Sequence, residues 1–141
     1  MIRLLVNPDD KQALDAFIAE YGVDAVDRDG RTFLMSAVAK NNLELVSYLI
    51  GKNYDLSATD NQGMTALHMA AIHDFPEVAE LLLDHGAEID PTDAWGNTPL
   101  WRAAMNSPEQ NSATANLLLA RGADAGKENN SGVAPSALLH N

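Results

Sequence analysis

The side chains of this sequence that could perform acid–base or metal chemistry are four histidines and twenty acidic residues, with no cysteine. Imidazole acts as a general base or a metal ligand, and paired carboxylates can divide acid and base roles. A metal site would need several histidines to converge, but these are spread along the chain: His68, His73, His85 and His140. The acidic pair Asp9-Asp10 is typical of a helix start. The sequence lacks a glycine-rich phosphate loop and an HExxH motif, so we expect no enzyme, metal site or cofactor.

The charge balance excludes some partners and favours others. Twenty Asp and Glu against nine Lys and Arg give a net charge of −11. Such a protein repels phosphate backbones and anionic membranes and attracts basic proteins. We therefore expect no nucleic acid and no membrane as a partner. The alternative is that the acidity only keeps the protein in solution.

Length and hydropathy set further bounds. A chain of 141 residues suggests one domain, 1–141. No apolar run approaches the ~20 residues that span a bilayer. The first six residues are followed at once by Asn7-Pro8-Asp9-Asp10, which is too early and too acidic for a signal peptide. These features predict a cytoplasmic protein.

Three stretches of the chain resemble one another at a spacing of 33 residues. They are DGRTFLMSAV from Asp29, NQGMTALHMA from Asn61 and AWGNTPLWRA from Ala94. Their glycines stand at 30, 63 and 96 and their threonines at 32, 65 and 98. A second series of apolar segments lies downstream of each stretch, and its last apolar positions step by 33 and then by 36: Ile50, Leu83 and Leu119.

Each unit has the pattern of two short helices. The threonine suits a helix N-cap, and Pro99 after Thr98 suits the first helical position. The second helix of the middle unit carries an apolar stripe at i, i+3, i+4 spacing: Val78, Leu81 and Leu82. Each second helix is followed by a residue suited to the left-handed conformation: Asn53, Gly86 and Gly122. No unit can bury its stripe alone, so neighbouring units are expected to stack.

These features resemble a known family. TALHMAA at 65–71, EVAELLLDHGAEID at 77–90 and TPLWRAA at 98–104, together with the 33-residue period, are similar to the ankyrin repeat. The resemblance covers about residues 27–128 and implies an all-α solenoid. The expected division is an N-terminal cap (1–26), repeats at 27–59, 60–92 and 93–128, and a partial C-terminal cap (129–141). The resemblance also implies that His68 is structural and ties the turns together.

The flanks have the features of degenerate capping units. Asn7-Pro8 suits the start of a helix with apolar residues Leu14, Phe17 and Ile18, ending at Gly22. This predicts the second helix of a degenerate first repeat. At the other end Gly132 and Pro135 keep the register of Gly96 and Pro99, but Ala134 and Ser136 depart from the family pattern. We expect one short helix there.

The third unit carries three extra residues. Ser107-Pro108-Glu109-Gln110 fits a capping box, with Ser as N-cap, Pro at the first position and Gln at the third. The insertion is therefore expected to lengthen the second helix of that unit by about one turn. The alternative is an irregular loop between the two helices.

The resemblance implies that a partner protein is held on the concave side, which is built by the turn tips and the exposed face of each first helix. The tip positions are Arg28, Asp29, Arg31, Asn61, Gln62, Met64, Ala94, Trp95 and Asn97. The first-helix positions are Ala39, Lys40, Ile72, His73, Met105 and Asn106.

Both tryptophans of the chain fall in this region. Trp95 occupies a tip position that is polar in the other units, and interface anchors are enriched in tryptophan. We expect Trp95 to anchor a partner; the alternative is that it folds against Trp101 or a neighbouring tip. Trp101 stands where the middle unit has His68, which predicts packing between repeats. Met64, Ile72 and Met105 would extend an apolar track beside Trp95; the alternative is ordinary packing between repeats. Of four aspartates nearby, some are expected to form turns and the rest to give the tips a negative rim: Asp29, Asp60, Asp90 and Asp93.

The predicted function is non-catalytic binding of a partner protein, with a basic partner favoured by the charge. One hypothesis is an inhibitor of a basic enzyme, such as the immunity protein of a toxin. The alternatives are a scaffold or regulatory adaptor that joins two proteins, and a structural solenoid that self-associates. We expect a monomer, with a homodimer through the C-terminal end as the alternative.

Overall fold

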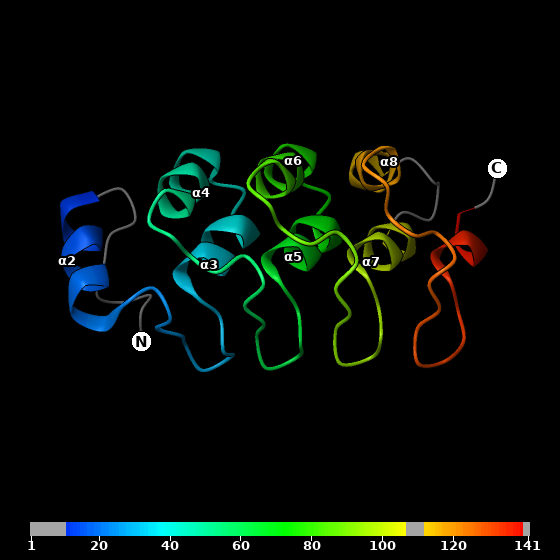
Figure 1. Cartoon of the computed structure of the whole chain (residues 1–141), viewed down its shortest axis with the longest axis horizontal. Coiled ribbons are helices and arrows are strands. Elements are labelled where there is room, and N and C mark those ends of the chain that lie inside the picture. Colours follow the sequence, from blue (N-terminus) through cyan, green and yellow to red (C-terminus); the bar gives the residue numbers. More distant parts are fainter. Residues whose placement is uncertain (1–10, 107–111, 140–141) are drawn as a thin grey trace.

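The structure is a computed structural model that describes residues 11–106 and 112–139. Its helices form two layers along one row (Figure 1). The first helices of the units are α3 (Phe33–Ala39), α5 (Ala66–Ile72) and α7 (Pro99–Met105), and the second helices are α4 (Leu43–Ile50), α6 (Pro76–Asp84) and α8 (Ala113–Ala120). Turns project from one side between successive pairs. The described ranges contain no strand, and the predicted all-α solenoid is confirmed.

Threonine caps begin the three first helices, as the repeat predicts. The hydroxyl oxygens of Thr32, Thr65 and Thr98 accept hydrogen bonds from the backbone N–H three residues later, at 3.3, 3.3 and 3.1 Å. Each hydroxyl satisfies one of the helix-start donors that have no partner within the helix. The same three residues therefore fix where each first helix starts and how it enters the stack.

The core is a column of leucines in register between the units. Leu34, Leu67 and Leu100 of the first helices are at most 1% exposed, and the second helices add three leucines that are fully buried: Leu49, Leu82 and Leu118. Burying a leucine stabilises by roughly 1.5–3 kcal/mol, so these contacts between neighbours hold the stack. Among the described helices, none has both the length and the apolar character needed to cross a membrane.

The second helices end as predicted. Asn53, Gly86 and Gly122 have φ angles of 66°, 95° and 95°, which lie in the left-handed region. At the N-terminal end, α2 (Lys11–Tyr21) buries Leu14 and Phe17 and is followed by Gly22 at φ 81°. The predicted helix start at Asn7-Pro8 lies outside the described residues.

The C-terminal cap continues the turns but not the helices. Gly132 has a φ of 77°, close to the 79° of Gly96, so the tip is retained. The short helix expected after it is a single 3-10 turn, η1 (Pro135–Ala137), which packs beside α7. Pro135 is buried and Leu139 packs against the core, so this short segment covers part of the exposed end of the stack.

The predicted lengthening of the second helix in the third unit is wrong. Helix α8 begins at Ala113, with Ser112 as its N-cap, and it has 8 residues, as α4 has. The capping box expected at 107–110 lies outside the described residues. Asp74, in the loop before α6, explains the choice of cap, because its carboxylate accepts hydrogen bonds from Ser112 Oγ at 3.1 Å and Thr114 N at 3.0 Å.

Candidate functional site

Each turn tip is built around one side-chain oxygen. In the third unit Asp93 Oδ1 accepts hydrogen bonds from Trp95 N and Asn97 N, both at 3.0 Å. Asp27, Asp60 and Asn129 make the same pair of bonds in the other tips. An acceptor that bonds the backbone two residues ahead stabilises a turn. These residues therefore form the tips on which the candidate contact residues lie.

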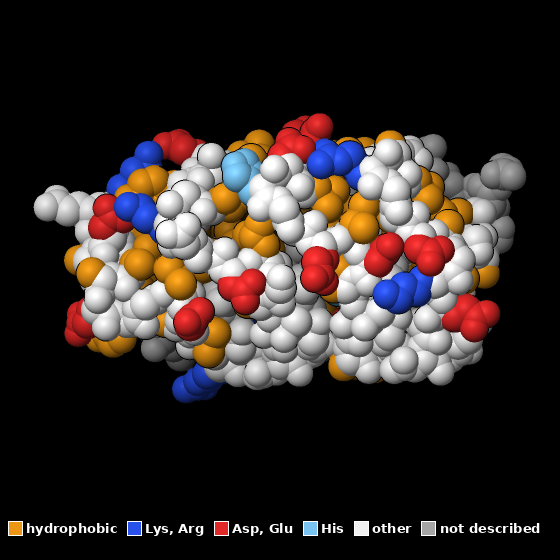
Figure 2. All heavy atoms as spheres, viewed as in Figure 1, with side chains coloured by type: hydrophobic (Ala, Val, Ile, Leu, Met, Phe, Trp, Pro, Cys, Tyr) orange, Lys and Arg blue, Asp and Glu red, His pale blue; other side chains and the backbone are white. Residues whose placement is uncertain are grey.

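Backbone hydrogen bonds join each tip to the next. Asn61 N donates to Asp29 O at 2.9 Å, Ala94 N to Gln62 O at 3.0 Å and Asn130 N to Trp95 O at 3.0 Å. The described tips thus form a continuous edge along one side of the molecule (Figure 1). On the face seen in Figure 2, most acidic side chains lie in the middle band, and few charges lie along the edge with the tips.

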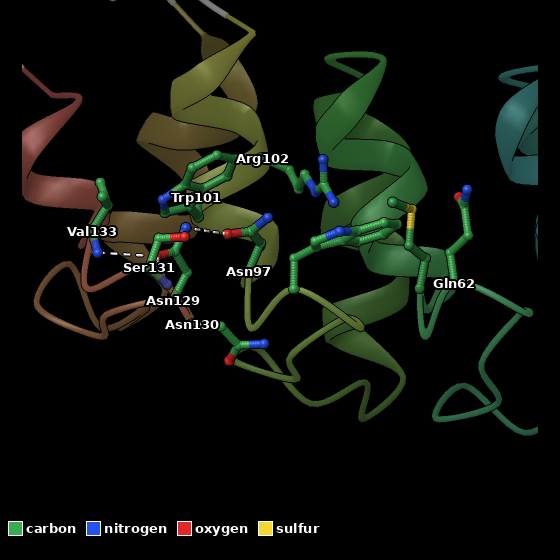
Figure 3. Close-up of a pocket in the computed structure, with 10 residues that line it drawn as sticks. Gln62, Asn97, Trp101, Arg102, Asn129, Asn130, Ser131 and Val133 are labelled. Atoms are coloured by element: carbon green, nitrogen blue, oxygen red, sulfur yellow. Dashed lines mark hydrogen bonds between the residues drawn. The ribbon is translucent and has the colours of Figure 1, made fainter.

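A pocket of about 560 Å³ opens between helix α7 and the tips at 60–64, 93–97 and 129–133. In Figure 3 Asn97, Asn129, Asn130 and Ser131 lie on two adjacent turns, Gln62 lies on the turn of the preceding unit, and Trp101 and Arg102 lie on α7 above them. Its lining combines aromatic, aliphatic and amide side chains: Gln62, Met64, Trp95, Asn97, Trp101, Arg102, Asn129, Asn130, Ser131 and Val133. Six of the ten lining residues are polar and four are apolar or aromatic, and this mixed lining makes the open pocket a candidate contact site.

Arg102 organises the aromatic wall of this pocket. Its guanidinium carbon lies 5.5 Å from the ring centre of Trp95 and 5.8 Å from that of Trp101, within the range of cation–π attraction. Its Nε and Nη2 donate to Asp93 Oδ2 at 2.9 and 2.7 Å, and the Asp93 side chain is fully buried. Asp93 therefore both forms the tip that carries Trp95 and holds the guanidinium between the two indoles.

The two tryptophans differ in exposure. Trp95 is 49% exposed, so nearly half of a large aromatic side chain faces solvent at the pocket rim. Trp101 is half-buried against the turn that carries Asn129 and Ser131, as its predicted packing role requires. Its buried Nε1 has no hydrogen-bond partner among the residues described. The repeat brings the two indoles to one pocket.

The structure spreads the predicted contact residues over three environments. Seven are exposed: Lys40, Asn61, Gln62, His73, Trp95, Met105 and Asn106. Arg31 and Ile72 are half-buried. Met64 and Asn97 are buried at 7% and 4% exposure, so they offer a partner little surface outside the pocket they line. Asn106 also supports the stack, since its amide donates to Ile72 O at 3.0 Å.

Two of the four aspartates around the track are turn formers, as was expected for some of them. Asp60 and Asp93 are buried as turn formers, and each lies beside an arginine, Arg31 at 3.7 Å and Arg102 at 2.7 Å. Asp90, half-buried, accepts a hydrogen bond from Asp124 N at 3.1 Å in the next unit, and Asp29 alone is exposed at a tip. Two of the four carboxylates are therefore withdrawn from the surface that the tips offer to a partner.

Sequence reasoning missed Arg102 and the whole C-terminal tip as site residues. Asn129 lies one repeat after Asp93 when the three-residue insertion is counted, so the repeat register could have indicated the fourth tip. Arg102 carried no such signal, because its counterparts Ser36 and Met69 are uncharged. Its role depends on the turn that lies beside it in space.

His68 is structural, as expected. Its Nδ1 accepts a hydrogen bond from Thr65 N at 3.1 Å, which leaves the proton on Nε2, and Nε2 donates to Asn97 O in the next unit at 2.8 Å. Burial holds the pKa of the ring below its ordinary value of 6.5, although the Asn97 carbonyl acts in the opposite direction. Within the described residues, no three His or acidic side chains gather to hold a metal.

This pKa predicts acid destabilisation. As the pH falls through 6.5 the unfolded chain takes up a proton on His68 that the folded chain does not, so the free energy of unfolding decreases. We expect urea denaturation at pH 7, 6 and 5 to show this decrease, and His68→Gln, which cannot titrate, to reduce the dependence while lowering overall stability. If the free energy of unfolding of His68→Gln depended on pH as strongly as that of the wild type, His68 would not be the source of the acid destabilisation.

A family model confirms the architecture. The model for ankyrin repeats (3 copies) matches residues 2–93 and 61–129. These overlapping matches cover most of the chain, which therefore belongs to the ankyrin-repeat family. Ankyrin repeats are generally non-catalytic modules for protein–protein interaction. A comparison with curated proteins gives no match.

Proposed function

We propose that this chain binds its partner protein through the concave surface made by the turn tips and the first helices, with Trp95 as the anchor. The observation that carries the proposal is an indole 49% exposed at the rim of a 560 Å³ pocket. Exposed tryptophan beside a cavity is typical of an interface centre, where tryptophan supplies much of the binding energy. Met105, 57% exposed on α7, adds apolar surface to the same unit.

The partner in this proposal is a basic protein. The net charge of −11 attracts a basic surface at long range and speeds encounter. The acidic side chains in the middle band of Figure 2 flank the tips and serve this purpose without occupying the pocket. An inhibitor of a basic enzyme would bind one such protein, whereas a scaffold would bind two or more, and a self-associating solenoid would bind itself.

We expect Trp95→Ala to weaken partner binding by about 2 kcal/mol, roughly thirtyfold, because the exposed indole is buried by the partner. The experiment is an affinity capture from host lysate at low and high salt, read by mass spectrometry, followed by calorimetry with the recovered partner. Tyr21→Ala is the matched control, since Tyr21 is an aromatic residue 55% exposed on α2 at the other end.

The outcomes separate the alternatives. One basic protein retained by wild type and Tyr21→Ala, weakened by salt and lost by Trp95→Ala, supports an inhibitor that uses the tips. Several partners that Trp95→Ala leaves bound would contradict the proposed surface. A dimer in dilute solution that persists in Trp95→Ala would favour self-association through another surface.

A further inference from the structure

The pocket beside Trp95 restricts the chemistry of what can fill it. We propose that it takes an uncharged aromatic side chain from an extended segment of the partner, with a main-chain carbonyl of that segment accepting a hydrogen bond from Arg102. This inference rests on the proposed function, because it names what the partner inserts. Its three supports are the charge at the pocket, the hydrogen-bonding state of the lining, and the size and character of the walls.

A cationic side chain is disfavoured by Arg102. The guanidinium already lies 5.5 Å from the Trp95 ring and 5.8 Å from the Trp101 ring. A lysine or arginine placed on these rings would gain less from the indoles, because one cation already polarises them, and it would be repelled by Arg102 at close range. The basic character proposed for the partner therefore belongs to the surface around the inserted segment and not to the inserted side chain.

A carboxylate is disfavoured as well. Arg102, the single charged residue that lines the pocket, already forms an ion pair with Asp93 at 2.7 Å. A second carboxylate would have to compete with Asp93 and would enter a chain whose net charge is −11. The remaining choice is an uncharged side chain.

Two amide acceptors of the lining are already bonded, and the buried donor Trp101 Nε1 has no partner in the described part of the chain. Asn97 Oδ1 accepts from Asn129 Nδ2 at 2.9 Å, and Asn129 Oδ1 accepts from the backbone of its own tip. Figure 3 shows these bonds on the tip side of the pocket. Arg102 directs Nε and Nη2 to Asp93, and no residue in the described part of the chain accepts from its Nη1. An incoming acceptor can pair with these unpaired donors, and a main-chain carbonyl supplies one without adding charge.

The walls suit an aromatic ring. Trp95, Met64 and Val133 provide flat and flexible apolar surface, and methionine sulfur contacts aromatic rings favourably. A volume of about 560 Å³ admits one large side chain and part of the adjoining main chain. A second hollow of about 260 Å³ shares the lining residue Gln62 with this pocket and includes Arg31, so an extended segment lying along the tips would contact both.

The test is selection of random linear peptides on the immobilised full chain, without reference to the natural partner. We expect the selected peptides to share Phe, Tyr or Trp at one position. Replacing that residue with Ala, Lys or Glu should weaken binding about tenfold or more. Binding is measured by the anisotropy of labelled peptides, and for peptides without Trp also by protein emission, because both tryptophans of the chain line this pocket.

Variants of the chain locate the site. Trp95→Ala should weaken the selected peptides about tenfold or more, and Arg102→Lys, which keeps the charge but loses the planar donors, should weaken them several-fold. Tyr21→Ala should leave them unchanged. The inference would be overturned if the peptides shared Lys, Arg, Asp or Glu at the position whose contribution to binding is lost in Trp95→Ala. It would also be overturned if Trp95→Ala bound the selected peptides as tightly as the wild type.

The two proposals fail separately. Suppose that Trp95→Ala abolishes capture of the partner protein but no selected peptide requires both Trp95 and an aromatic residue. The proposed binding surface is then supported, and the proposal that an aromatic side chain fills the pocket is wrong. If Trp95→Ala changes neither the partner nor the peptides, both are wrong.

Discussion

Gly63→Ala should destabilise the protein far more than Gly132→Ala, although the two glycines have nearly the same backbone conformation. Their φ angles are 75° and 77°, where a Cβ costs about 1–2 kcal/mol. A Cβ on Gly63 would also lie 2.9 Å from Ala94 N and 3.2 Å from the Asp93 carbonyl carbon, both backbone atoms of the next tip. A Cβ on Gly132 would meet nothing within 4 Å.

The difference between the two variants measures how closely the tips must approach. Separating the tips around Gly63 strains the bond from Ala94 N to Gln62 O and adds about 1–3 kcal/mol of overpacking, for a total of about 2–5 kcal/mol. Denaturant unfolding of wild type and both variants checks this expectation. Equal losses would show that only the left-handed backbone matters and that tip spacing does not contribute.

Much of the fold follows from the sequence because its signals are local and repeated. Thr32, Thr65 and Thr98 are N-caps in sequence and in structure, since a cap acts within three residues of itself. The left-handed stops are local in the same way. The period of 33 residues then requires that neighbours stack, because a single helix pair leaves its stripe exposed.

The start of α8 shows where local signals fail. Ser107 and Ser112 both suit an N-cap, and the Ser-Pro-Glu-Gln sequence favours the first of them. The structure uses Ser112, to which Asp74 is joined across 38 residues. A contact of that range cannot be obtained from the spacing of a capping box.

The sequence predicted the candidate site only in part, because repeat register gives a residue's position but not the direction of its side chain. Register placed Trp95 at a tip, and the structure finds it exposed there. Repeat register does not show whether an aspartate at a tip faces solvent or folds inward, because aspartate is common both on surfaces and as a turn-forming acceptor. Asp60 and Asp93 fold inward and accept two backbone N–H bonds each, so these two are the turn formers expected among the tip aspartates.

Asp93→Ala should cost about 3–5 kcal/mol of stability, because it leaves Arg102 without its partner and two backbone N–H groups of the tip without an acceptor. Asp93→Asn should cost less, about 1–3 kcal/mol, since an amide oxygen can still accept from Trp95 N and Asn97 N. Asn129 makes the same pair of bonds in the fourth tip, which shows that an amide suffices for the turn. The measurement is denaturant unfolding, with tryptophan emission as a second readout.

Asp60→Asn is the matched control for the ion pair. Asp60 forms the same turn and lies beside Arg31, but their closest approach is 3.7 Å, and Arg31 Nε has no hydrogen-bond partner in the described ranges. Asp60→Asn should therefore cost less than Asp93→Asn. Equal costs for the two variants would mean that the Arg102 pair adds nothing beyond the turn.

The emission readout connects this pair to binding. When Asp93→Asn releases Arg102, the guanidinium is no longer held between Trp95 and Trp101, so the emission of the folded protein should change while Asp60→Asn leaves it unaltered. Peptides selected on the wild type should bind Asp93→Asn more weakly, because the donor that meets their carbonyl has lost its fixed position. Unchanged emission and unchanged peptide binding together would show that Asp93 stabilises the tip but does not position Arg102 for the partner.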